Sequence, residues 1–167
     1  MDTTYTQFTQ AAVHFLRWNL ERITVCIGEL TEQEVWQRPN SSSNSVGNQL
    51  LHLSGNIRQW MHNGIGQLPD VRRRDSEFAA TGGYTKQELL TELAKVIGTA
   101  VTIIEQQDAS SLRPERPVQA YVHDGNYIIL HVVEHLSYHT GQIIFWTKLL
   151  RDKDLHLYGT ENLNQTN

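Results

Sequence analysis

The sequence is poor in cysteine and has no excess of positive charge. Cys26 is the only cysteine among 167 residues, which excludes an internal disulfide and a zinc site built from several cysteines. Histidine or carboxylate side chains would therefore have to hold any metal ion. The formal net charge is −4, which gives no basic field for a phosphate backbone, so we expect no nucleic-acid partner.

Long apolar runs are also missing. No stretch reaches the roughly eighteen consecutive apolar residues that a membrane-spanning helix needs. Residues 1–10 are polar and include Asp2, unlike the basic and then apolar start of a secretory signal. We therefore expect a cytoplasmic protein without a membrane partner. The length fits one domain over residues 1–167, with a bundle over about 4–150 and a polar tail over about 153–167.

Helical periodicity is the main feature that is present. Four segments repeat apolar residues at every third or fourth position, and none alternates as a strand would. These segments cover, to within a few residues, 4–30, 46–63, 85–106 and 125–150. The connection over residues 67–84 is long enough for the middle two helices to run parallel. The pattern predicts an all-α protein, a four-helix bundle.

Three histidines follow one another at intervals of four residues in the last predicted helix. Imidazole is the commonest protein ligand of zinc, nickel and iron. His131 and His139 lie about 12 Å apart along the helix axis, too far to bind one ion. The candidate pairs are therefore His131 with His135, and His135 with His139. The second pair is favoured because His139 lies within the apolar arc of the helix and His135 lies at its edge.

A rival motif overlaps the first pair. His131, Glu134 and His135 match the H-x-x-E-H arrangement of inverzincin peptidases. Such an enzyme needs a further carboxylate ligand well downstream. Glu161 is the only glutamate among the 32 residues that follow His135 in this chain of 167. We regard the match as a chance one.

A fourth histidine, His52, lies in the second predicted helix. It falls outside the apolar arc, on a polar stripe that it shares with Gln49, Asn56 and Asn63. By itself this position is typical of an exposed histidine. A polar stripe can also border a cleft between helices, where a ligand could reach it.

Two segments together resemble a known family. Residues 44–53 and residues 135–143 are similar to the DinB-like superfamily of bacterial metal-binding four-helix proteins. In that superfamily a histidine of the second helix joins an H-x-x-x-H pair of the fourth, and a Gly-Gln dipeptide follows closely. The matching positions are His52, His135 and His139. The resemblance implies that these three side chains bind one divalent metal ion per chain, namely nickel, zinc or iron.

The resemblance also implies an up-down-down-up bundle that often forms a homodimer. Characterised members of that superfamily use low-molecular-weight thiols. Three neutral imidazoles leave a metal ion with an open position, which suits Lewis-acid chemistry on a bound thiol or water. We therefore expect a metal-dependent transferase or hydrolase acting on a small molecule, with thiol transfer as the leading analogy. The alternatives are a non-catalytic metal-binding or stress-response protein and a purely structural bundle.

No catalytic residue can be assigned beyond the metal ligands. Tyr138 and Gln142 flank them and would bind substrate, orient a histidine or simply pack, and His131 could be a neighbour of the site. Glu134 points away and is expected in solvent. The run Arg72-Arg73-Arg74 fits either an anion-binding lid or, preferably, a solvated loop. The remaining histidines lack partners at chelating spacing and are expected at the surface; they are His14, His62, His123 and His156.

Overall fold

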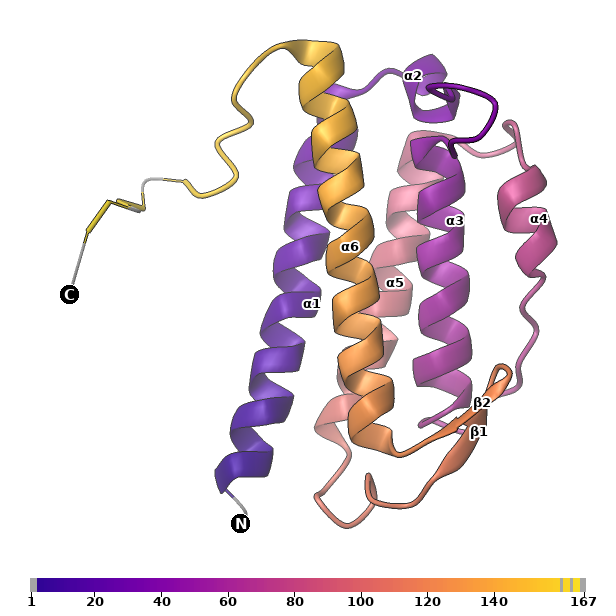
Figure 1. The fold of residues 1–167 in the computed structure, drawn as a ribbon, viewed down its shortest axis with the longest axis vertical. Coiled ribbons are helices and arrows are strands. Elements are labelled where there is room, and N and C mark those ends of the chain that lie inside the picture. The colour runs from indigo at the N-terminus through magenta and orange to yellow at the C-terminus, as the bar shows by residue number, and fades with distance from the viewer. Residues whose placement is uncertain (1–2, 160, 163, 166–167) are drawn as a thin grey trace.

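Four long helices lie side by side in the computed structural model, which describes residues 3–159, 161–162 and 164–165. They are α1 (Thr3–Glu29), α3 (Val46–Ile57) continued by the π-helix η1 (Arg58–Asn63), α5 (Lys86–Glu105) and α6 (Gly125–Arg151). Helix α1 packs against α5 and α6, and α3 packs against the same two helices. The chain runs up α1, down α3, down α5 and up α6 (Figure 1). The predicted all-α, up-down-down-up bundle is confirmed.

Capping side chains set the helix starts. Three helices begin with a capping box, at Thr31, Ser45 and Thr85. In each box the hydroxyl of the capping residue accepts a hydrogen bond from the backbone N–H three residues later, and the side chain of that later residue accepts one from the backbone N–H of the capping residue. The box at Thr85 was predicted, whereas Thr31 opens α2 (Glu32–Trp36), a short helix that the sequence did not predict. Asp124 caps α6 by accepting from two backbone N–H groups.

The core is aliphatic and fills the space between the four long helices. Burial of such side chains is the main favourable term in folding, at about 25 cal/mol for each Å² removed from water. None of the described helices is long and apolar enough to span a membrane. The largest fully buried side chains include Leu16, Ile23, Leu50, Leu53, Leu93, Ile97 and Ile128.

The long connection between α3 and α5 crosses the outer side of α3 and carries the short helix α4 (Arg74–Ala79) (Figure 1). Asn48 of α3 anchors it, because its amide donates to the carbonyls of Glu77 and Ala80 at 2.9 and 2.7 Å. Near its end, the indole of Trp36 donates to the carbonyl of Tyr84 at 3.0 Å. The sequence predicted this connection as irregular and missed α4.

A small hairpin precedes α6. Strands β1 (Arg116–Val118) and β2 (Tyr121–His123) pair antiparallel, and Gln119 lies in the turn between them with a positive φ of 55°. The prediction that no strand is present is wrong, because three residues are too few to show alternation. The hairpin lies beside η1, and the Trp60 indole donates to the Gln119 side chain at 3.0 Å. It therefore borders the end of the bundle where α6 begins.

Candidate metal centre

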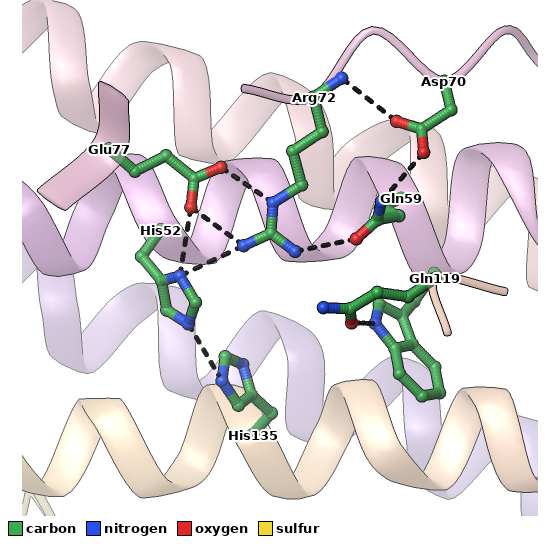
Figure 2. A network of polar contacts seen from close by, with 8 residues as sticks. His52, Gln59, Asp70, Arg72, Glu77, Gln119 and His135 are labelled. Carbon is green, nitrogen blue, oxygen red and sulfur yellow. Dashed lines mark hydrogen bonds and ion pairs between the residues drawn. The ribbon is translucent and has the colours of Figure 1, made fainter. Parts of the chain in front are cut away.

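Three histidines from two helices meet between α3 and α6. His52 comes from α3, and His135 and His139 come from α6. The Nε2 atoms of His52 and His135 are 3.2 Å apart (Figure 2). One ring nitrogen from each of the three residues lies within 4.8 Å of the others, close enough for a single metal ion. Of the two candidate pairs, the structure brings His135 and His139 together with His52.

Two of the three rings have an acceptor on the nitrogen that faces away from the cluster. Glu77 Oε2 lies 3.1 Å from Nδ1 of His52, and Gln49 Oε1 lies 3.3 Å from Nδ1 of His139. An Nδ1–H that donates to such an acceptor leaves the lone pair on Nε2. The acceptors therefore favour the tautomers in which both rings present a lone pair to the cluster. The Nδ1 of His135 is buried without a hydrogen-bond partner among the described residues.

Arg72 holds Glu77 in place. Its Nε and Nη2 atoms donate to the two carboxylate oxygens of Glu77 at 2.8 Å each, and its Nη1 donates to Gln59 Oε1 at 3.0 Å (Figure 2). Such a two-pronged pair is among the strongest polar contacts in proteins. The Arg72 side chain is only 3% exposed, so the prediction of a solvated arginine run is wrong for this member, whereas Arg73 and Arg74 are exposed.

The absence of a side chain at Gly55 makes room for this carboxylate. A Cβ atom added to Gly55 would lie 2.0 Å from Oε1 of Glu77 and 3.0 Å from Nε of Arg72. Any larger residue at this position of α3 would therefore displace the carboxylate. No sequence pattern predicts this contact, because it joins α3 to the connection that crosses it.

The electrostatics of the cluster keep two of its imidazoles, those of His135 and His139, neutral. Burial, helped by the neighbouring histidines, lowers the pKa of His135 to about 3. Burial and His52 lower the pKa of His139 to about 4, although Gln142, hydrogen-bonded to the ring, opposes the shift. Burial raises the pKa of Glu77, but hydrogen bonds from Arg72 and His52 outweigh it and lower the pKa overall. At neutral pH the rings of His135 and His139 are thus neutral, and an ionised carboxylate lies behind His52.

His52 is not the exposed residue that its polar stripe suggests. It is 7% exposed, and Gln49 and Asn56 on the same stripe are also buried. Helix α4 covers this face of α3, and the ring of Phe78 from α4 lies 4.8 Å from the ring of His52. The stripe is polar because it faces a polar site, which agrees with the alternative of a cleft between helices.

The other candidate residues lie around the cluster. The exposed Tyr138 touches His139 edge to face at 5.2 Å, and Gln142 hydrogen-bonds that histidine. His131 does not reach the cluster; its ring stacks on Trp60 at 3.7 Å. Glu134 is exposed, as predicted.

A cavity of about 330 Å³ opens beside His52 and His135. Trp60, Asn56 and residues of the hairpin contribute to its walls. His123 is among them and is stacked on Tyr127 at 3.6 Å, so the prediction that it lies at the surface, unconnected with the site, is wrong. His62 is also half-buried, with Nε2 3.0 Å from the carbonyl of Val96, whereas His14 and His156 are exposed as predicted.

The fold and the histidine cluster define a DinB-like four-helix protein. The family model for mycothiol-S-transferase matches residues 11–151, and the chain belongs to that family. No match was found among curated proteins.

Solved structures with the same fold have low sequence identity. A conserved protein from Enterococcus faecalis has a TM-score of 0.71 at 17% identity, with 87% of this chain and 98% of that chain covered. A DinB-like protein from Bacillus cereus has a TM-score of 0.68 at 14% identity, with 86% and 91% covered. A DinB-like protein from Bacillus subtilis has a TM-score of 0.65 at 14% identity, with 86% and 94% covered. These similarities support the fold.

Proposed function

We propose that this protein is a metal-dependent S-transferase that joins a low-molecular-weight thiol to a small electrophile. His52, His135 and His139 would bind one divalent ion, namely nickel, zinc or iron. The observation that carries the proposal is that two of these imidazoles, those of His52 and His135, line an accessible cavity of about 330 Å³. The family model names mycothiol as the thiol.

The residues fit a metal ion by the chemistry of their donor atoms. Metal ligation requires neutral imidazole, and the lowered pKa values of His135 and His139 provide it at neutral pH. Ligating histidines in metal proteins donate their other N–H to a carboxylate or a carbonyl oxygen. Glu77 and Gln49 occupy these positions on His52 and His139.

The proposed reaction forms one carbon–sulfur bond. A bound divalent ion with an open position lowers the pKa of a thiol and favours the thiolate, which is the nucleophile. The thiolate sulfur attacks the electrophilic carbon, the bond from that carbon to the leaving group breaks, and the thiol proton and the leaving group are released. Glu77 and Gln49 orient the rings.

A metal assay tests the site. Protein purified without a histidine tag is analysed by mass spectrometry beside His52→Ala, His135→Ala and His139→Ala, with His14→Ala as the matched control because His14 is exposed and remote. We expect about one ion per chain, lost in the three site variants and retained in the control. Wild-type protein that takes up no metal after reconstitution would refute the proposal.

A thiol-consumption assay tests the activity. Metal-loaded protein is incubated with mycothiol and chlorodinitrobenzene, and the aryl thioether is measured by its absorbance. We expect turnover that disappears in His135→Ala. Stoichiometric metal without turnover on this or other electrophiles would favour the alternative of a non-catalytic metal-binding protein, and ester hydrolysis without thiol would favour a hydrolase.

We also propose a cytoplasmic homodimer. Cytoplasmic thiol pools are kept reduced, as such a transferase requires. The outward face of α6 offers an apolar stripe for the second copy, since its side chains are 47 to 69% exposed; they are Tyr127, Leu130, Tyr138, Phe145 and Leu149. Analytical ultracentrifugation with Phe145→Glu tests this, and a monomeric wild type would refute it.

A further inference from the structure

We propose that the cavity beside the three histidines binds the carboxylate group of a small substrate, and that Arg74 is the positive charge that recognises it. The inference rests on the proposed function, because the same cavity would lead the substrate to the metal. It goes further by naming a chemical group of the substrate and the residue that selects it.

The charges around the cavity favour an anion. Its lining contains two arginines and four histidines and no aspartate or glutamate; the full set of ionisable lining residues is His52, Arg72, Arg74, His123, His131 and His135, with Tyr121 and Tyr127 beside them. Glu77 neutralises Arg72 through two hydrogen bonds. No carboxylate of the described residues pairs with Arg74, whose guanidinium instead lies 4.8 Å from the centre of the Phe78 ring. An entering carboxylate would meet a positive charge that the protein leaves uncompensated.

Two residues of the cavity lining carry buried polar atoms without partners in the described part of the chain. Asn56 is 4% exposed, and its Oδ1 atom is buried with no hydrogen-bond partner in the described part of the chain. The Nε2 atom of His131 is buried and unpartnered in the same way. Both atoms have almost no contact with solvent, so each lies behind the surface of the cavity and becomes available to a ligand only if its side chain rotates.

The volume limits the ligand to a small molecule. A space of about 330 Å³ equals that of about eleven water molecules in the liquid, at about 30 Å³ each. This lies at the lower end of the range for small-molecule sites. The carboxylate could belong to the thiol or to its electrophilic partner, because both must approach the same three histidines.

Two matched pairs of probes show whether the carboxylate belongs to the thiol or to its electrophilic partner. Mercaptopropionate and mercaptoethanol differ by a carboxylate on a thiol, and benzoate and benzamide differ by a charge on a molecule without a thiol. Binding is measured by calorimetry to both metal-free and zinc-loaded protein. We expect the carboxylate member to bind more tightly in at least one pair, by about threefold to tenfold, already in the metal-free protein.

Variants of neighbouring arginines show which residue causes the preference for the carboxylate probe. Arg74→Gln should abolish the preference for the carboxylate, and Arg74→Lys should retain part of it. Arg73→Gln is the matched control, since Arg73 is exposed and borders a separate groove of about 880 Å³ between α4 and α5. Circular dichroism checks that each variant is folded.

The inference would be overturned if neither pair showed a preference, or if the preference persisted undiminished in Arg74→Gln. A preference that appears only after zinc loading and does not depend on Arg74 would mean that the carboxylate binds the metal itself, which also overturns it. The metal assay is independent of this result. Loss of metal binding with a retained Arg74-dependent preference would refute the proposed function alone.

Discussion

Replacing Glu77 by glutamine should weaken metal binding without unfolding the protein. The Nδ1 atom of His52 lies 3.1 Å from both Glu77 Oε2, which can only accept, and Arg72 Nη2, which can only donate. A ring nitrogen carries either a proton or a lone pair, so only one of these contacts can be a hydrogen bond at a time. The carboxylate favours the proton on Nδ1, which leaves the lone pair on Nε2 for a metal ion.

The expected loss of metal affinity follows from the loss of this carboxylate. Glutamine has nearly the same size but no charge, and Arg72 would then lie beside His52 with its positive charge unpaired. Donation from Arg72 to Nδ1 would move the ring proton to Nε2, where it competes with the metal. Loss of a carboxylate behind a ligating histidine costs about tenfold to a hundredfold in metal affinity, which corresponds to about 1.4 to 2.8 kcal/mol.

Zinc affinity measured by competition with a chelator provides the assay, and nitrogen NMR of the metal-free protein reports the tautomer of His52. Glu92→Gln is the matched control, because Glu92 also pairs with an arginine, Arg58, but lies on the half-exposed surface of α5. An affinity for Glu77→Gln within about twofold of wild type, with an unchanged His52 tautomer, would refute the reasoning.

Gly55→Ala should reproduce the effect from the opposite side of the contact. Alanine in the middle of a helix is normally favourable over glycine by about 0.5 to 1 kcal/mol. At Gly55, however, the new methyl group would collide with the carboxylate of Glu77 and push it from His52. Gly98→Ala is the control, since no atom lies within 4 Å of its added Cβ in α5. Metal affinity should fall in Gly55→Ala alone, and an equal affinity in both variants would contradict the contact.

Three further predictions concern stability. Leu93→Ala should lower the free energy of unfolding in urea by about 2 to 5 kcal/mol because Leu93 is fully buried, whereas Leu149→Ala, at a 62% exposed position, should change it by less than about 0.5. Thr85→Ala should cost about 1 kcal/mol in the same assay, because it removes the cap of α5. Hydrogen bonds from Arg151 lower the pKa of Glu34 from 4.5 to about 2. This contribution to stability is complete above pH 4.5 and is lost as the pH falls through about 2, so unfolding of Glu34→Gln should depend less on pH in that range, and an unchanged acid profile would count against it.

The long helices could be predicted because their signal is local and repeated. Apolar spacing over about eighteen residues or more, with a capping box at Thr85, placed α1, α3 with its continuation η1, α5 and α6 within a few residues of their observed bounds. The short elements α2, α4 and the hairpin have too few residues to show a period. Tertiary contacts, such as the bonds from Asn48 to the connection, stabilise them instead.

Part of the candidate site could likewise be predicted from the sequence, and part of it could not. The pairing of His135 with His139 depends only on helix geometry, so the spacing gave two candidate pairs and the apolar arc of the helix favoured this one. The burial of His52 depends on which segment covers its side of α3, and a hydropathy pattern carries no such information. Glu77 and Arg72 lay in a stretch without periodicity, where a charge pair five residues apart gives no signal of its contact with a histidine of another helix.

The connection between α3 and α5 thus unites the two functions proposed for the site. On α4, Glu77 points to the histidine cluster and Arg74 lines the cavity, so one short helix both orients a metal ligand and presents the charge for the substrate. Asn48 fixes that helix to α3 through two backbone carbonyls, and it is itself completely buried. Because the same anchor determines the position of both side chains, a shift of α4 would change metal affinity and carboxylate recognition together. The connection has no periodicity that would predict its role, yet it contributes the residues that distinguish a site for chemistry from three histidines that merely lie close together.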